Sequence, residues 1–471
     1  MSLFKIAWRS IQQRGLASLL TAASMALGVM LVVCVLLIMG IVSESFHNNS
    51  SLGYNMIVGA KGGKLQLVLN TVYYLSSPVE NIPYTFYQEF LNAEQRGDGR
   101  KGEFADLTEF AIPVCLGDYF GEFRVVGTTP QMFDDFVYDL DKGRKYEFAA
   151  GRNLRTYTPE HGYYEAVLGA TVAREMKLNV NDTFSPSHAT PDGDTHEKFF
   201  VVGVLAPSGT PNDRAAFINM EGFYLLEGHA KPVEIDDDVL PPGLPTAAEQ
   251  ATDTAKSDLV EARQAIRPLA IPQREVTAVL LRSVSPLVTL GLRTTINEGP
   301  VSQAVLPIRE IYTLFNTVVG PIKYVLLLFT IMICVVSGVS ILVSIYNSMS
   351  DRRHEIAVMP ALGAGRQTVM LVVLLESIIL ALGGALLGWT AGHLLIGGLA
   401  SPFIEDRTGV AIGMFDFSPK INLFSALGNS PIVDWGISGE LLLVPGLVML
   451  AIIVGFLPAL AAYRTDVAES L

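Results

Sequence analysis

The sequence predicts an α-helical membrane protein with four transmembrane helices and an α+β extracytoplasmic domain inserted between helices one and two. Half of the 471 residues are apolar and only 17% are charged, below the roughly 25% typical of soluble domains. The charges are unevenly placed: 36 of the 46 acidic and 23 of the 33 basic residues lie between Val42 and Gly320, which therefore carries the whole net charge of −13. Four long apolar stretches make up much of the remainder.

This distribution excludes two classes of protein. A purely soluble enzyme would not carry four apolar stretches of this length. A nucleic-acid binder would need a basic face, whereas the charged segment is acidic. We therefore expect membrane lipids, and no nucleic acid, among the partners.

The N-terminal elements are a short amphipathic helix and a first membrane span. In residues 1–15, Phe4, Ala7, Trp8 and Ile11 follow helical spacing, which is typical of a helix lying in the cytoplasmic interface. It would serve as an orienting anchor or contact a partner. Residues 16–42 contain no charge and are too long for the core of a cleaved signal peptide, so they are predicted as transmembrane helix 1.

Residues 43–319 form the predicted extracytoplasmic domain. Its β-rich runs are predicted strands and its 3.6-periodic runs predicted helices. The strands are Phe123–Val126, Glu165–Leu168, Phe199–Leu205 and Val276–Leu281, and the helices are Thr171–Leu178 and Ser302–Val318. Residues 229–258 are rich in Pro, Asp, Ala and Thr, which predicts a flexible surface excursion.

The rest of the chain is predicted to cross the membrane three more times. Transmembrane helices 2, 3 and 4 are assigned to 320–349, 368–399 and 439–462, joined by a cytoplasmic loop at 350–367 and an extracytoplasmic loop at 400–438, with a cytoplasmic tail at 463–471. Basic residues before the first span, in the 350–367 loop and after the last span place both termini in the cytoplasm. These residues are Lys5, Arg9, Arg14, Arg352, Arg353, Arg366 and Arg464.

The third span carries two features of interest. Gly384, Gly388 and Gly392 recur at four-residue spacing, which indicates a helix-packing or dimer face, although glycine is common in membrane helices generally. Glu376 is the lone acid in a predicted span, and intramembrane carboxylates are costly and often functional. A structural or gating role is favoured over catalysis, because no protease motif accompanies it.

A cluster of potential metal ligands lies at His188, Asp192, Asp194 and His196. They flank a Pro-Asp-Gly turn sequence, so a solvated hairpin tip is the default interpretation. Imidazole and carboxylate groups are also the ligands of a transition-metal site, but the spacing matches no defined motif.

The run Gly59–Lys64 superficially resembles a phosphate-binding loop. It lacks the required preceding Gly, and Leu65 stands where Ser or Thr is needed. We therefore expect no nucleotide, no cofactor and no enzymatic activity in this chain, and any ATP hydrolysis would be done by a partner subunit.

Several segments carry a family resemblance. Asp351–Ala364 reads DRRHEIAVMPALGA and resembles the R-x-x-E-I-A-x-x-R-A-L-G-A cytoplasmic loop of the FtsX-like/MacB-like permease family of ABC transporters. The tail Leu457–Leu471 is similar to that family's ending, and residues 55–64, 123–129, 167–183 and 201–214 resemble its MacB-type core domain. Pro360 departs from the family's usual Arg, and Asn179 and Asn181 stand where relatives often have Gly.

The resemblance implies a permease subunit in a bacterial inner membrane, working as a homodimer or with a paralogous permease and driven by a cytosolic ABC ATPase subunit. It also implies an ATPase-coupling loop made of Arg352, Arg353, Glu355, Ala361, Leu362, Gly363 and Ala364. The expected role is to transmit ATP-driven motion to the extracytoplasmic domain for export or extraction of a lipoprotein, lipid, peptide or drug. A periplasmic adaptor or a substrate lipoprotein would then be a further partner.

Two alternatives remain open on the sequence. The same architecture serves as a non-transporting mechanotransmission regulator of extracytoplasmic cell-wall hydrolases or as a signalling partner. An intramembrane enzyme built around Glu376 is the third reading, and it predicts that Glu376→Gln abolishes activity without altering assembly.

Overall fold

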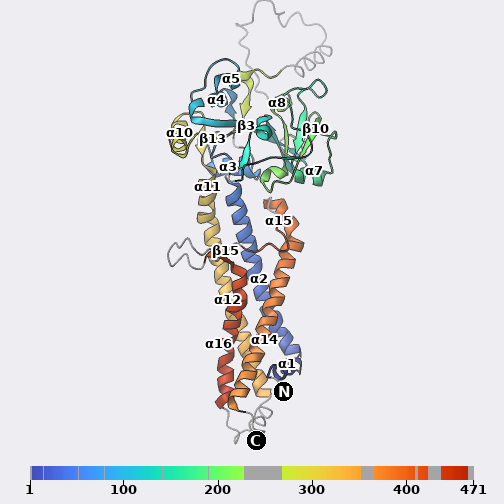
Figure 1. Cartoon of the computed structure of the whole chain (residues 1–471), viewed down its shortest axis with the longest axis vertical. Coiled ribbons are helices and arrows are strands. Elements are labelled where there is room, and N and C mark those ends of the chain that lie inside the picture. Colours follow the sequence, from blue (N-terminus) through green and yellow to red (C-terminus); the bar gives the residue numbers. More distant parts are fainter. Residues whose placement is uncertain are drawn as a thin grey trace, which may run out of the picture. The chain divides into compact units, whose positions relative to one another are not determined.

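The computed structural model divides the chain into two compact units (Figure 1). A helical unit comprises Met1–Ser45 and Phe315–Leu471, and an outer unit comprises Phe46–Leu314. The structure describes residues 3–13, 15–50, 52–78, 80–140, 142–188, 190–191, 193–226, 268–351, 365–408, 412–418, 420–422 and 436–464. The predicted excursion at 229–258 and the predicted tail after Arg464 lie outside these residues.

The helical unit is built from long apolar helices that run side by side in Figure 1. Its elements are α1 (Leu3–Gln13), α2 (Gly15–Asn49, which ends within the outer unit), the π-helix η6 (Phe315–Val319), α12 (Gly320–Asp351), α14 (Arg366–His393), the π-helix η7 (Leu394–Ala400), α15 (Ser401–Thr408), β15 (Lys420–Asn422), β16 (Gly436–Ser438), the 3₁₀ helix η9 (Gly439–Leu442) and α16 (Leu443–Arg464). Helical structure thus continues to Thr408, beyond the predicted start of the outer loop at residue 400.

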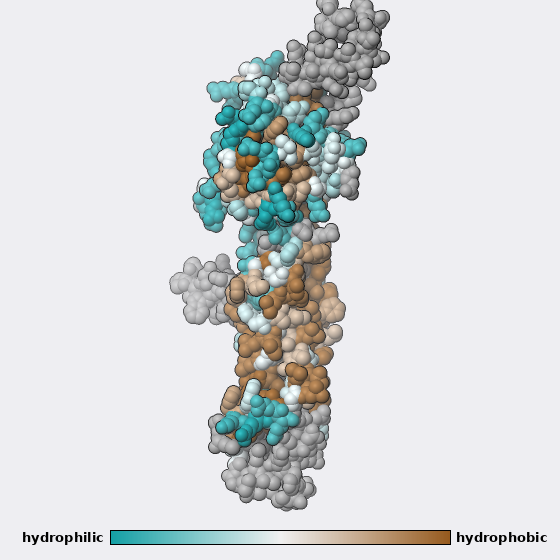
Figure 2. All heavy atoms as spheres, turned by 90° about the vertical axis from the view of Figure 1, so that its right-hand side faces the viewer, coloured by the Kyte–Doolittle hydropathy of each residue, from teal (hydrophilic) through white to brown (hydrophobic). Residues whose placement is uncertain are grey.

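Three helical segments of the described chain are long and apolar enough to cross a membrane: Gly15–Phe46, Met370–Glu405 and Gly439–Phe456. They coincide with predicted spans one, three and four. The helix α12 covers the second predicted span, and its crossing of the membrane stays a prediction. The surface of the described helical unit in Figure 2 is dominated by hydrophobic residues, as expected of a surface in contact with lipid.

The outer unit is centred on a mixed ten-stranded sheet in the order β14-β1-β13-β3-β4-β11-β8-β10-β7, with β9 paired to β10. The pairs β4–β11 and β8–β10 are parallel and the other pairs are antiparallel. In chain order these strands are β1 (Met56–Gly59), β3 (Thr108–Phe120), β4 (Phe123–Thr128), β7 (Phe148–Gly151), β8 (Glu165–Leu168), β9 (Thr183–Phe184), β10 (Phe199–Leu205), β11 (Ala215–Asn219), β13 (Ala278–Ser283) and β14 (Gln303–Val305). Short strands β2 (Ile82–Pro83) and β12 (Glu275–Val276) pair with each other, as do β5 (Val137–Asp139) and β6 (Arg144–Lys145).

The core of the outer unit lies along the central strands. Every residue of β1, β4, β8 and β11 is buried, so these strands are covered on both faces. The helices of the outer unit are α3 (Lys64–Tyr73), α4 (Tyr84–Gln88), α5 (Ala93–Arg96), α6 (Gln131–Asp134), α7 (Ala170–Met176), α8 (Met220–Tyr224), α10 (Pro286–Glu298) and α11 (Pro307–Leu314).

The first three predicted strands are confirmed as β4, β8 and β10, and the first predicted helix as α7. The fourth predicted strand, Val276–Leu281, is divided: Val276 ends β12, and β13 begins at Ala278. The second predicted helix, Ser302–Val318, is wrong at its start. Gln303–Val305 forms the edge strand β14 instead, because it pairs with β1, and only from Pro307 does the chain become helical.

Candidate functional site

The predicted ATPase-coupling loop lies outside the described residues. Arg352, Arg353, Glu355, Pro360, Ala361, Leu362, Gly363 and Ala364 all fall in the undescribed segment 352–364. What the structure gives are its two flanks. The helix α12 ends at Asp351, and α14 begins at Arg366 behind the N-cap Gly365, so the loop directly joins these two helices.

The glycine stripe of α14 packs against α2 of the same chain. A Cβ atom added at Gly384 would lie 2.7 Å from Met25 Cβ, and one at Gly388 would lie 2.3 Å from the carbonyl oxygen of Ala26. A Cβ at Gly392 would lie 2.9 Å from Val33 Cγ1. The two helix backbones therefore approach so closely that only hydrogen fits between them, which is the property of small-residue helix interfaces.

Glu376 is buried at the junction of α1 and α14. Its exposed fraction is 7%, and Ser10 Oγ donates a hydrogen bond to its Oε2 at 3.1 Å. Ser10 belongs to the amphipathic N-terminal helix and is itself buried. The carboxylate thus ties the interfacial helix to the third predicted span, a contact that periodicity along one helix does not reveal.

A buried His–Glu pair joins the outer end of α14 to η9. His393 Nε2 lies 2.9 Å from Glu440 Oε2, and the Glu440 side chain is fully buried. His393 Nδ1 lies 3.2 Å from the carbonyl oxygen of Met414. The amide of Ser418 donates to Glu440 Oε1 at 2.9 Å. The sequence alone does not reveal this pair, because its members are 47 residues apart.

The outer unit buries a second carboxylate, Glu165 of β8. Arg152 binds it as a fork, with Nη2 at 2.6 Å from Oε1 and Nη1 at 2.8 Å from Oε2. The amide of Arg155, the hydroxyl of Thr158 and the ring of His161 complete the shell. Burial opposes ionisation of this group, but the hydrogen bonds outweigh it and lower the pKa of Glu165 to about 2.

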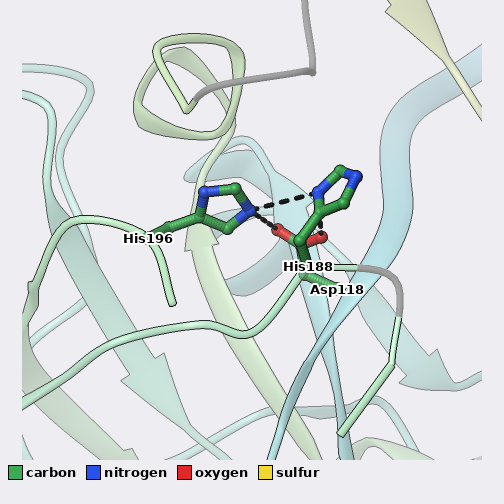
Figure 3. A group of neighbouring side chains, drawn as sticks. All are labelled: Asp118, His188 and His196. Atoms are coloured by element: carbon green, nitrogen blue, oxygen red, sulfur yellow. Dashed lines mark hydrogen bonds and ion pairs between the residues drawn. The ribbon is translucent and has the colours of Figure 1, made fainter. Parts of the chain in front are cut away.

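The third polar cluster of the outer unit brings Asp118 together with His188 and His196 (Figure 3). His188 Nδ1 lies 3.2 Å from His196 Nε2 and 3.6 Å from Asp118 Oδ1. His196 Nε2 lies 3.5 Å from Asp118 Oδ2. Of the other members of the predicted cluster, Asp194 contributes its main-chain carbonyl to His188 and no side-chain ligand atom to this group, and Asp192 lies outside the described residues.

One hollow of about 560 Å³ lies in the outer unit between α3, α10 and α11. Its charged lining consists of Lys61, Lys64, Arg293, Glu298, Arg309 and Glu310. Cations and anions are mixed, and the apolar lining is limited to Ala304, Val305 and Leu306. This differs from the mostly apolar walls of typical small-molecule pockets.

Two family models match the chain. Residues 18–265 match the MacB-like periplasmic core domain, and residues 327–467 match the FtsX-like permease C-terminal domain. The first match alone covers more than half of the 471 residues. The chain belongs to the FtsX/MacB-like family of ABC permeases. No curated protein matches it.

As an FtsX/MacB-like permease, the chain is a membrane protein of the type that forms the membrane subunit of an ABC transporter. The two matches divide the candidate residues between them. Asp118, His188 and His196 fall within the periplasmic core match, and Glu376 and the glycine stripe fall within the permease match. The predicted coupling loop also lies within the permease match.

Proposed function

We propose that this permease transmits the movement of a separate cytosolic ATPase to its outer unit, and that this movement exports or extracts a lipoprotein, lipid, peptide or drug. The chain would lie in a bacterial inner membrane with both termini in the cytoplasm and the outer unit outside. It would work as a homodimer or beside a paralogous permease.

The observation that carries this proposal is the course of α2. The helix is continuous from Gly15 to Asn49, and its last turn, from Phe46, belongs to the outer unit. There the ring of Phe46 stacks on Tyr73 of α3 at 4.4 Å, and its carbonyl accepts a hydrogen bond from the Tyr73 hydroxyl. A helix without a break transmits axial or tilting displacement along its length.

The helix α14 is the second element of the proposed path of movement. At Gly384, Gly388 and Gly392 this helix approaches α2 so closely that an added Cβ atom would clash with it. The predicted coupling loop immediately precedes α14 in the chain. Displacement of the loop by an ATPase would therefore reach α2 through a tight helix pair, and α2 continues into the outer unit.

The proposal is tested by purifying the full chain in nanodiscs with its copurifying proteins and measuring ATP turnover. The test variant is Arg352→Ala/Arg353→Ala/Glu355→Ala. The matched control is Lys142→Ala/Arg144→Ala/Glu147→Ala, which removes the same numbers of cations and anions from exposed positions of the outer unit.

We expect an ATPase to copurify with the wild type and with the control, and the test variant to lose that ATPase or to reduce its turnover by at least about tenfold. A tenfold lower turnover corresponds to about 1.4 kcal/mol of activation free energy. Absence of any ATPase from the wild type, or an unchanged turnover in the test variant, would overturn the proposal. An ATPase coupled to a hydrolase rather than to a cargo would identify the regulatory alternative.

A further inference from the structure

We propose that Asp118, His188 and His196 form a binding site for a divalent transition-metal ion of the zinc class on the outer unit. The site is independent of the ATPase coupling proposed above. It differs from the cluster visible in the sequence, because one ligand comes from β3 and only the two histidines come from the 185–198 loop.

The backbone positions the three side chains. Ser187 forms isolated β-bridges with Tyr119 on one side and Thr195 on the other. The amides and carbonyls of Ser187 and Tyr119 exchange hydrogen bonds at 2.7 and 3.0 Å. Each proposed ligand is the chain neighbour of one of these bridged residues: Asp118 precedes Tyr119, His188 follows Ser187 and His196 follows Thr195. Residues that lie opposite each other on paired extended strands, and residues two apart on one strand, project to the same face. The two bridges therefore bring the three ligands together.

The distances between the ligand atoms suit one small ion. Zinc binds imidazole nitrogen and carboxylate oxygen at about 2.0–2.2 Å in tetrahedral geometry, which places its ligand atoms about 3.3–3.5 Å apart. The two ring nitrogens lie 3.2 Å apart, and each lies 3.5 or 3.6 Å from a different oxygen of Asp118. One ligand atom from each of the three residues lies within 4.8 Å of the other two. The carboxylate turns one oxygen toward each imidazole (Figure 3).

The charge and exposure of the group also favour a cation. The Asp118 side chain is fully buried, with the buried Arg124 within electrostatic range, and its carboxylate is the anionic ligand of the group. Two imidazoles among three ligands favour zinc-class ions over calcium or magnesium, which prefer all-oxygen sites. His196 is buried, whereas the His188 side chain is 46% exposed, so the site opens to solvent on the His188 side. Three protein ligands with an open fourth position are the arrangement of exchangeable or reactive zinc sites rather than closed structural ones.

The test uses the full chain in detergent with a purification tag that contains no histidine. The protein is stripped with a chelator, loaded with Zn²⁺ and gel-filtered, and bound metal is counted by mass spectrometry. Affinity is measured by competition with a chromogenic chelator, and Co²⁺ loading provides the visible absorption bands of a tetrahedral site. The variants are Asp118→Asn, His188→Ala and His196→Ala.

The matched control is Asp194→Asn, the same chemical change at an exposed residue of the same loop. We expect one zinc ion per wild-type chain, at least about 100-fold weaker binding in the three variants and a change of less than threefold in the control. The expected loss exceeds the 10–100-fold effect of removing a mere outer-shell partner.

Three results would overturn the proposal. They are no retained ion in the wild type, binding that is unchanged in His188→Ala, and preference for Ca²⁺ or Mg²⁺ over Zn²⁺. Because Asp118 and His196 are buried, their replacement can also disturb folding. The His188 side chain is half exposed, so zinc binding by His188→Ala is the decisive measurement. Hydrogen exchange of the outer unit checks that this variant is folded.

Discussion

At the scale of single residues, the outer unit holds Glu165 as a buried anion inside a shell of five donors. The Arg152 fork supplies two of them, and the groups of Arg155, Thr158 and His161 supply the rest. Removing one partner of such a buried pair typically costs about 3–5 kcal/mol, because the other charge is left uncompensated. The stability of the outer unit should therefore depend on this carboxylate.

The pH dependence of that stability has a definite sign. The pKa of Glu165 falls from an ordinary 4.5 to about 2 on folding. The carboxylate therefore contributes stability above pH 4.5 and loses that contribution as the pH falls toward 2. The shift corresponds to about 3 kcal/mol. We expect Glu165→Gln to lower the free energy of unfolding by about this amount at pH 7 and to flatten its dependence on pH between 4.5 and 2.

The measurement must follow tyrosine, because the three tryptophans, Trp8, Trp389 and Trp435, all lie outside the outer unit. Near-ultraviolet circular dichroism during denaturation serves this purpose. Glu160→Gln is the control, since Glu160 lies five residues before Glu165 and its side chain is 83% exposed. Equal pH profiles for the wild type and Glu165→Gln would contradict the assigned role.

The group of Asp118, His188 and His196 shows how much of the candidate site could be predicted from single residues. His188 and His196 stand eight residues apart, and their types alone indicated possible ligands. Asp118 stands 70 residues before His188, near the end of the strand β3, and the pairing of Tyr119 with Ser187 brings it to the histidines. Asp194 lies in the same stretch of sequence as His188 and His196, yet its side chain supplies no ligand atom to the cluster. Sequence proximity identified the loop, and the fold determines which side chains meet.

At the scale of secondary-structure elements, the close packing of α2 on α14 is the most specific feature of the helical unit. Added methyl groups in a tight interface cost about 1–3 kcal/mol, because the helices must separate. We expect Gly388→Ala to lower the free energy of unfolding of the helical unit by about this amount. The reason is that the added Cβ would lie 2.3 Å from the Ala26 carbonyl oxygen. Tryptophan fluorescence reports the transition, because Trp8 and Trp389 belong to this unit.

The control for this prediction is Gly383→Ala in the same helix. A Cβ atom at Gly383 meets nothing within 4 Å, so the substitution should be neutral or slightly stabilising through helix propensity. If both substitutions shift the transition equally, the stripe acts through helix propensity and not through its contact with α2.

Elements with strong local patterns were predictable, and those fixed by distant partners were not. The apolar stretches and the β-branched runs of β4, β8 and β10 identify their own structure. Gln303–Val305 has no such pattern of its own. It becomes a strand because it completes the sheet edge beside β1, and tertiary pairing overrides local preference in this way.

At the scale of the whole molecule, the described chain passes between the two units by two helical routes. One is α2, which is continuous from Gly15 to Asn49. The other runs from α11 through the π-helix η6 into α12, and the boundary between units falls at the first residue of η6. A π-helical turn within a helical segment is rare and often marks a functional site. Under the proposed function, the first route would carry movement to the outer unit.

The proposed function requires that ATP-driven movement of the cytosolic ATPase changes the conformation of the outer unit. The most direct measurement is hydrogen–deuterium exchange of residues 46–314 in the nanodisc complex, with and without a trapped ATP state. We predict altered protection in α3 and the adjoining strand β1 of the wild type. We predict no such change in Arg352→Ala/Arg353→Ala/Glu355→Ala at equal ATPase occupancy. An outer unit whose exchange ignores the nucleotide state in the wild type would contradict the account.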